Sequence, residues 1–164
     1  MAEGFARFIV GANPVRTAVR SGALIAAGVL LVTYGILPVR GSGPSMLPTV
    51  KDGQLMIVSR LSYRLRRPRR GELAAVRLQD ERAVLVKRII AGPRDRLAIA
   101  RGMVSVNGVA LAEPYVSLRN PWQIDAFVLG DDEYFVVGDN RGMPMALHTM
   151  GRVAGDRLIG PVLW

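Results

Sequence analysis

The distribution of apolar residues divides the chain into two parts with different patterns. From Ser21 to Val39 no charged residue interrupts the run SGALIAAGVLLVTYGILPV. Folded as a helix, this run would be about 28 Å long, close to the thickness of the hydrocarbon core of a bilayer. The sequence therefore predicts a transmembrane anchor helix over residues 21–39, preceded by a short N-terminal segment over residues 1–20.

Charged residues on either side of this run predict its orientation. Arg7, Arg16 and Arg20 precede it, and Arg40 alone follows immediately. The positive-inside bias then places residues 1–20 in the cytoplasm and the rest of the chain outside the membrane. A cleaved signal peptide and a buried helix of a soluble protein are the alternatives. The run is long for a signal peptide, however, and no Ala-x-Ala site ends it.

After residue 50 the pattern changes to short apolar runs separated by turn residues, and no long helical period remains. Asn107-Gly108 is a strong signal for a two-residue hairpin turn. The pattern predicts a mainly β domain over residues 40–164, with antiparallel sheets packed as a barrel-like or sandwich structure. Within it, about 95–130 is expected to be a smaller inserted hairpin subregion. Strands are expected at 54–59, 72–78, 83–91, 96–100, 103–106, 109–112, 133–138 and 157–163.

Composition and charge narrow the classes of function. The hydrophobic share of 50% favours a packed core over disorder, and the net charge is +9. The densest basic run is RLSYRLRRPRR at 60–70, from Arg60 to Arg70, which could contact anionic lipids or be a solvated loop. Binding of nucleic acid is not expected. One His, no Cys and no carboxylate cluster with ligand spacing give no sign of a metal site, and no cofactor is implied.

A candidate nucleophile lies in the stretch GSGPSMLPT, residues 41–49. Ser45 stands there between Pro44 and Met46, with Pro48 close behind, which is a stiff presentation for a loop serine. A serine hydroxyl is a poor nucleophile until a base takes its proton. The stretch therefore raises the question of which side chain is the base.

Two residues could accept the proton of this serine. His148 is the only histidine, but lone histidines are usually structural. Of the 22 Lys and Arg residues only Lys51 and Lys87 are lysine, and only lysine can lose its proton at usable pH. In AVLVKRIIA, Leu85, Lys87 and Ile89 share one face of a strand, so burial would lower the pKa of the lysine. A lysine that reaches from a half-buried strand to solvent remains the alternative.

Five segments in order then resemble those of bacterial type I signal peptidases of the S26 family. These are membrane-anchored serine proteases that remove signal peptides from exported preproteins with a Ser-Lys dyad. One such segment would be a weak signal, but five in order behind one anchor are highly specific. The segments are GPSMLPT (43–49), Tyr63 and Pro68 with RGE (70–72), VKRIIAGPRD (86–95), VNGVALAEPYV (106–116) and EYFVVGDNR (133–141).

The resemblance implies roles for individual residues. Ser45 would be the nucleophile and Lys87 the general base, and the reaction would pass through an acyl-enzyme. The substrate would bind as an added β-strand and be cut after an Ala-x-Ala-like site. The residues implied for substrate binding are Gly43, Pro44, Met46, Leu85 and Val86, and those implied for supporting the site are Gly138, Asp139, Asn140 and Arg141. The location implied is the bacterial cytoplasmic membrane, with a single pass and the catalytic domain outside.

The last segment departs from the family pattern. After GDNR, residues 142–151 read GMPMALHTMG. Pro144 stands where the family usually has a serine that contacts the lysine, and Ala146 and His148 stand where it usually has an Asp–Arg pair. His148 could cap a carbonyl or pair with Asp139, and Thr149 could supply a hydroxyl. Glu72 also replaces the usual Asp of the second segment.

Two alternatives to a general signal peptidase follow from these observations. The first is a dedicated maturation peptidase of the same family, with one or a few substrates such as a pilin, a secreted enzyme or a conjugative-transfer protein. The second, from another class, is an inactive membrane-anchored binding module that uses the basic run. A soluble autoprotease of the repressor type would need a DNA-binding domain in place of the anchor, and the first 40 residues do not have that pattern.

Overall fold

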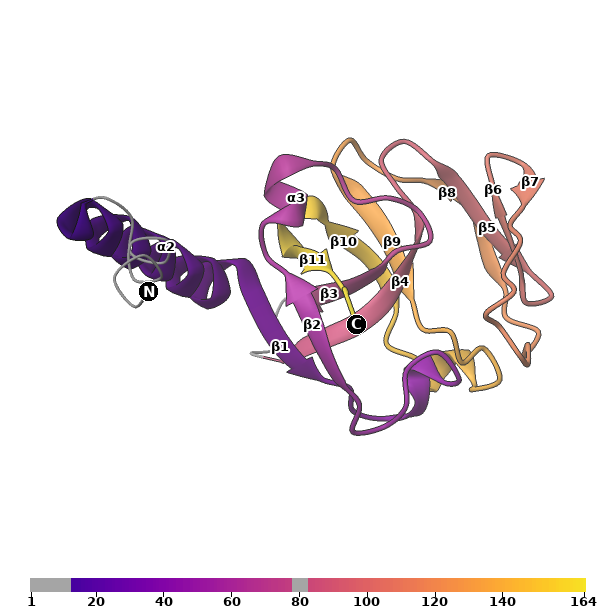
Figure 1. The fold of residues 1–164 in the computed structure, drawn as a ribbon. Coiled ribbons are helices and arrows are strands. Elements are labelled where there is room, and N and C mark those ends of the chain that lie inside the picture. The colour runs from indigo at the N-terminus through magenta and orange to yellow at the C-terminus, as the bar shows by residue number, and fades with distance from the viewer. Residues whose placement is uncertain (1–12, 78–82) are drawn as a thin grey trace. The chain divides into compact units, whose positions relative to one another are not determined.

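A computed structural model describes residues 13–77 and 83–164 (Figure 1). The chain divides into two compact units, one ending at Ile36 and the other running from Leu37 to Trp164. The second unit, here called the body, contains nearly all of the strands. The two units are described separately below.

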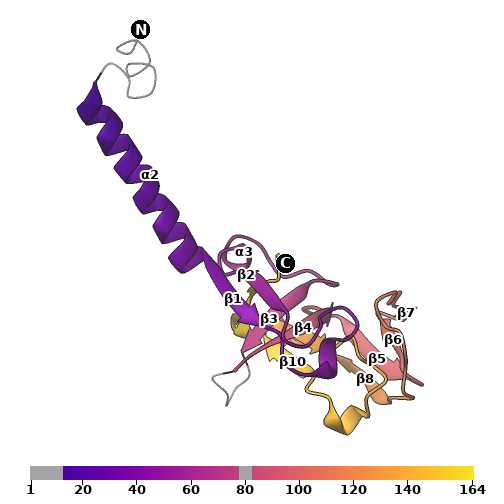
Figure 2. The same ribbon diagram turned by 60° about the horizontal axis from the view of Figure 1, so that its bottom comes forward.

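Among the described residues of the first unit, Pro14–Gly35 form the helix α2 (Figure 2). It begins before the predicted run because Asn13 caps it: the Asn13 side chain accepts a hydrogen bond from the Arg16 N–H at 3.2 Å, and Pro14 follows as the first helical residue. α2 is long and apolar enough to cross a membrane.

The C-terminal end of this helix differs from the prediction. Residues 36–39 were expected to be helical, but Ile36–Arg40 forms the strand β1. Leu37 precedes Pro38, and a residue before proline is sterically disfavoured in the helical conformation. The helix therefore ends at Gly35.

The body confirms the predicted mainly β fold with antiparallel sheets, and its described residues form no closed barrel. β1 pairs with β2 (Leu55–Ser59) in a two-stranded sheet. The five-stranded sheet has the order β10 (Gly151–Ala154), β9 (Glu133–Val137), β4 (Val84–Ala91), β3 (Leu73–Arg77) and β11 (Leu158–Pro161). The four-stranded sheet has the order β7 (Val109–Ala110), β6 (Met103–Val106), β5 (Arg96–Ala100) and β8 (Ile124–Val128). Short helical segments are α3 (Ser62–Leu65), η1 (Pro44–Met46), η2 (Met145–Leu147) and η3 (Gly155–Arg157).

Most strands lie inside the predicted ranges, and the hairpin at Asn107-Gly108 is confirmed. Both residues have positive φ, 55° and 81°, as a two-residue primed turn between β6 and β7 requires. Three strands were not predicted: β1, β8 and β10. β8 and β10 are edge strands, and their side chains are exposed or only half-buried, so they carry little hydrophobic signal.

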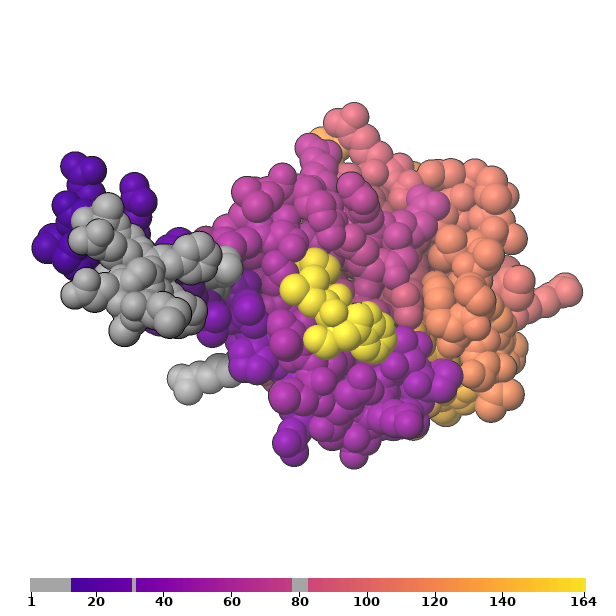
Figure 3. Space-filling model, in the orientation of Figure 1, coloured from indigo at the N-terminus to yellow at the C-terminus, as the bar shows by residue number. Residues whose placement is uncertain are grey.

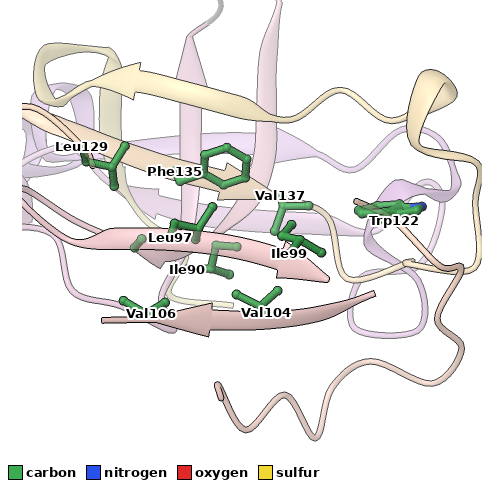
Figure 4. Packing of buried hydrophobic residues seen from close by; sticks show 10 residues of the cluster. Ile90, Leu97, Ile99, Val104, Val106, Trp122, Leu129, Phe135 and Val137 are labelled. Atoms are coloured by element: carbon green, nitrogen blue, oxygen red, sulfur yellow. The ribbon is translucent and has the colours of Figure 1, made fainter. Parts of the chain in front are cut away.

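The described residues of the body form three core clusters of apolar side chains. The largest joins the five-stranded and four-stranded sheets: Ile90 and Val137 from the former meet Leu97 and Ile99 from the latter (Figure 4). A second cluster joins β1 and β2 to Met46, Leu73 and Val86. The third contains Ala74, Ile89 and Val136 of the five-stranded sheet. β4 contributes side chains to all three clusters, so packing on both of its faces holds this strand in place.

Candidate active site

Ser45 lies in the short helical turn η1, Pro44–Met46. Gly43 precedes the turn with a φ of 82°, a left-handed conformation that glycine adopts without strain. Its N–H donates a hydrogen bond to Asp52 Oδ1 at 2.9 Å. Met46, which is 4% exposed, packs into the cluster of β1 and β2. The turn is thus held on both sides of Ser45, whose own side chain is half-buried.

Lys87 lies in the middle of β4, directly opposite Ala74 of β3. The lysine is 3% exposed, and its Nζ lies 2.7 Å from Ser45 Oγ. Its burial lowers the pKa of the Lys87 ammonium to about 8, although the negative charge of Asp139 raises it in part. A substantial fraction of the amine is therefore neutral near pH 8, and a neutral amine at this distance can accept the hydroxyl proton.

Asp139 joins three segments of the body behind this pair. It is completely buried, and Arg88 donates to both of its oxygens, from Nε at 2.8 Å and from Nη2 at 2.6 Å. Thr49 Oγ1 donates to the same carboxylate. The Arg88 guanidinium also donates to the Gly71 carbonyl at 2.7 Å and stacks on Tyr115, with the guanidinium carbon 3.8 Å from the ring centre.

Gly138 and Asn140 contact the backbone of the nucleophile turn. The Asn140 N–H donates to the Ser45 carbonyl at 3.0 Å, and Asn140 Nδ2 donates to the Pro44 carbonyl at 3.1 Å. A Cβ on Gly138 would lie 2.1 Å from the Ser45 carbonyl oxygen. Only glycine therefore permits this close approach of the two backbones.

Arg141 and Glu113 form a second buried ion pair next to this turn. Arg141 is 1% exposed, its Nη2 lies 2.7 Å from Glu113 Oε1, and its Nε donates to the Gly138 carbonyl at 2.8 Å. Arg119 lies 2.7 Å from the other oxygen of Glu113. Through Arg141 this pair helps to hold the Gly138 backbone in place.

His148 is buried beside Gly138, next to the Ser45 turn. Its ring stands edge-on to Trp122 at 5.0 Å and against Gly138. Neither ring nitrogen has a hydrogen-bond partner among the described residues, and the oxygens of Asp139 accept from other groups. The hypothesis that His148 pairs with Asp139 is therefore wrong, whereas backbone groups of Asn140 and Thr149 lie close enough to the ring to raise its pKa in part. Burial, with the charges of Lys87 and Arg141, lowers the pKa of His148 to about 4, so the ring is neutral at pH 7.

A small cavity of about 60 Å³ lies beside Ser45 and Lys87. Its lining includes Gly43, Met46 and, from β4, Leu85 and Val86. The cavity holds a few water-sized volumes, enough for a small aliphatic side chain and too little for an aromatic ring.

One edge of β4 is open next to this cavity. β3 pairs with β4 from Val84 to Arg88, whereas β9 pairs on the other side only from Arg88 onward. Among the described residues no strand pairs with the second edge at 84–87. Backbone donors and acceptors of this edge are thus available to an extended peptide.

The structure brings most of the predicted site residues together and separates a few. Pro44 does not line the small cavity, and its carbonyl instead accepts from Asn140. Pro144, Ala146 and Thr149 are exposed. Sequence reasoning missed Thr49, Arg88 and Glu113 as partners of the supporting residues. The only sequence signal for them was their position inside the quoted segments.

The body thus contains a serine and a buried lysine in hydrogen-bond contact, beside a small cavity and an open strand edge. The family described as signal peptidase, peptidase S26 matches residues 15–164. Probable signal peptidase I-2 of Synechocystis sp. is 34% identical over 122 residues, which cover 71% of this chain and 56% of that protein. Signal peptidase I of Leptolyngbya laminosa is 31% identical over 124 residues, with coverage of 71% and 61%. Signal peptidase I T of Bacillus subtilis is 29% identical over 129 residues, with coverage of 72% and 67%.

The chain belongs to the peptidase S26 family of signal peptidases. It spans less than two thirds of the length of the first two of these relatives. The resemblance found in the sequence is confirmed.

Proposed function

We propose that this protein is a membrane-anchored serine endopeptidase that removes N-terminal signal peptides from exported preproteins. The observation that carries the proposal is the 2.7 Å contact between Lys87 Nζ and Ser45 Oγ, with the lysine 3% exposed. A buried lysine on a serine oxygen has little structural benefit, since burying an ammonium is costly. A serine nucleophile without a histidine beside it needs another general base to take its proton, and Lys87 is placed to be that base.

In the proposed reaction the Ser45 hydroxyl attacks the carbonyl carbon of the scissile peptide bond as its proton passes to Lys87 Nζ. The Ser45 N–H donates no hydrogen bond among the described residues, so it is available to the oxyanion of the tetrahedral intermediate. One such donor lowers the barrier by about 3 kcal/mol. The Lys87 ammonium then protonates the leaving amine as the C–N bond breaks, which leaves an acyl ester on Ser45.

Release of the acyl group repeats these steps with water. Lys87, neutral again, accepts a proton from a water molecule that attacks the ester carbonyl. The ammonium then returns the proton to Ser45 Oγ as the ester bond breaks. The free signal peptide carries the new carboxylate, and the enzyme is restored.

The open edge of β4 supports binding of the substrate as an added strand. Backbone hydrogen bonds along 84–87 would supply affinity, and alternate side chains would point into pockets. The cavity beside Gly43, Met46 and Val86 suits a small side chain, which is consistent with cleavage after Ala-x-Ala-like sites.

The helix α2 supports placement in a membrane. We propose that it crosses the bacterial cytoplasmic membrane once, with the N-terminus in the cytoplasm, because Arg7, Arg16 and Arg20 precede the uncharged run 21–39 and Arg40 alone follows it immediately. Ser45 follows Arg40 by five residues, a reach of roughly 17 Å when extended. The nucleophile would therefore act near the outer surface of the membrane, where a signal-peptide cleavage site emerges.

The test is cleavage of a preprotein with an Ala-x-Ala site by the full chain in detergent. Ser45→Ala and Lys87→Ala are the test variants, and Lys51→Ala, which removes the other lysine at an exposed position, is the matched control. We expect mature product from the wild type and the control, and none above background from the two test variants. Good cleavage by Lys87→Ala would show that the base is wrongly assigned.

A panel of preproteins decides between a general and a dedicated peptidase. The unusual residues at 142–151 keep a dedicated maturation peptidase as the second candidate. Cleavage of several unrelated preproteins would support the general enzyme, and cleavage of a single one would support the dedicated enzyme. No turnover of any of them would favour the inactive binding module.

A further inference from the structure

A second cavity of the body, larger than the one beside Ser45, lies away from the Ser45–Lys87 pair. It is a groove of about 920 Å³, and it shares only Val84 with the small cavity. α3 and the loop that follows it form one part of its lining, and other parts come from the end of β3 and from loops near residues 131 and 156. Figure 3 shows the magenta segment of the chain that includes α3 on the surface of the body. The proposed peptidase reaction does not use this groove.

Arginine side chains dominate the charge of the groove. Five of them line it: Arg60, Arg64, Arg66, Arg67 and Arg77. Arg66 is neutralised by Glu72, whose carboxylate lies 2.7 Å from its Nη2. The other four form no ion pair among residues 13–77 and 83–164. These four guanidiniums are half-buried or exposed, so they can bind an anion from solution or from a surface.

Carboxylates in the lining offset only part of this charge. Asp131, Asp132 and Asp156 also line the groove. Asp131 is paired with Arg94 at 2.7 Å, which leaves Asp132 and Asp156 against the four unpaired arginines. The groove therefore has a surplus of positive charge, and that surplus is concentrated in the segment 60–67.

An exposed leucine accompanies these arginines. Leu65, the last residue of α3, is 84% exposed and stands between Arg64 and Arg66. A large apolar side chain bordered by arginines is the arrangement found where a protein surface enters the headgroup region of a bilayer. Free phosphate alone would leave this leucine without a partner.

A short stretch of chain connects one end of the groove to the proposed membrane anchor. Leu37 lines the groove and lies two residues after Gly35, the last residue of α2. Two residues span about 7 Å at most. If α2 crosses the membrane as proposed above, Leu37 at this end of the groove is within about 7 Å of the last residue of the anchor helix.

We propose that the arginine groove binds the phosphate headgroup of an anionic phospholipid, with Leu65 in contact with the lipid. Arg64 and Arg67 would bind the phosphate from α3 and the loop after it, with Arg60 and Arg77 contributing charge. The bound lipid would restrain the body at the membrane surface. Each basic side chain near an anionic membrane is worth about fivefold in binding, so removal of two would weaken it about 25-fold.

The first experiment reads out the position of Leu65. The chain has no cysteine, so Leu65→Cys allows a polarity-sensitive fluorophore to be attached at one position. The full chain is placed in nanodiscs of phosphatidylcholine and in nanodiscs of equal parts phosphatidylcholine and phosphatidylglycerol. We expect a blue shift in the mixed discs that is lost when Arg64→Gln and Arg67→Gln are added. The matched control is Arg96→Gln with Arg101→Gln, two exposed arginines outside the groove, which should keep the shift.

The second experiment distinguishes a lipid from a free anion. Short-chain phosphatidylglycerol, short-chain phosphatidylcholine and inorganic phosphate are titrated against the full chain in detergent. Tight binding of phosphatidylglycerol alone, weakened about 25-fold by the Arg64/Arg67 double variant, would support the proposal. Equal binding of the two lipids, an unchanged double variant, or binding of phosphate as tight as that of the lipid would overturn it. Neither experiment depends on peptidase activity, and cleavage of the preprotein by the same samples tests that function separately.

Discussion

Arg88 donates to both oxygens of Asp139, from Nε at 2.8 Å and from Nη2 at 2.6 Å, and the carboxylate is completely buried. Arg88 directly follows Lys87 in β4, and Asp139 directly follows Gly138, which touches the Ser45 carbonyl. The ion pair therefore links the segment of the proposed base to the segment that supports the nucleophile.

Removal of this carboxylate should destabilise the body. In Asp139→Ala, Arg88 loses its two-point partner and Thr49 loses its acceptor, so a nearly buried guanidinium is left uncompensated. A loss of about 3 kcal/mol in the free energy of unfolding is expected. Urea denaturation of the full chain in detergent measures it. Asp131→Ala, which breaks an ion pair with side chains about 80% exposed, is the control and should change stability little.

Peptidase activity should rise with pH through about 8. Below the pKa of Lys87, about 8, most of the amine is protonated and cannot accept the Ser45 proton. We expect kcat/KM to increase about tenfold per pH unit well below this value and to level off above it.

This profile also distinguishes the two candidate bases. A base with the pKa of His148, about 4, would already be neutral at pH 6 and would give a flat profile there. The His148→Gln variant should keep the rise near pH 8, even if its maximal rate falls. A rise that disappears in this variant would contradict the assignment of Lys87.

Lys87 should lower the stability of the fold at neutral pH. Its pKa falls from 10.5 to about 8 on folding, so the unfolded chain binds more protons between these values. The wild type therefore gains stability as pH rises from about 8 to 10.5, and its deficit is full below about 8. Lys87→Met should be more stable by on the order of 3 kcal/mol at pH 7, with the difference lost above 10.5. Thermal unfolding of both proteins across this pH range is the measurement, and a constant difference would argue against a shifted pKa.

Replacement of Gly138 by alanine should lower activity strongly, because it displaces the turn that carries Ser45. The Cβ of Gly138→Ala would lie 2.1 Å from the Ser45 carbonyl oxygen and 2.5 Å from His148, so the backbone of η1 must shift. Since a displacement of about 1 Å can cost 100-fold in rate, we expect at least that loss in kcat/KM. Gly92→Ala, whose Cβ would meet Tyr134 at an ordinary 3.5 Å, is the matched control. A Gly138→Ala enzyme with wild-type activity would show that the turn tolerates displacement.

The sequence by itself determined the mainly β body, one long apolar helix and the two residues of the proposed dyad. These features depend on local patterns: alternation in β4, an uncharged run in α2, and residue types inside short segments. It also located the hairpin at Asn107-Gly108, because a primed turn needs residues that accept positive φ.

Only the tertiary structure decided what surrounds the dyad. Arg88 and Thr49 meet on Asp139 although they are far apart in the chain, and His148 packs on Trp122 and Gly138. β8 and β10 remained unpredicted because edge strands bury few side chains. The helix end at Gly35 was misplaced because the apolar run continues through Pro38 into β1. Contacts between distant segments depend on how the whole body packs. The local pattern of residues along the chain does not specify them.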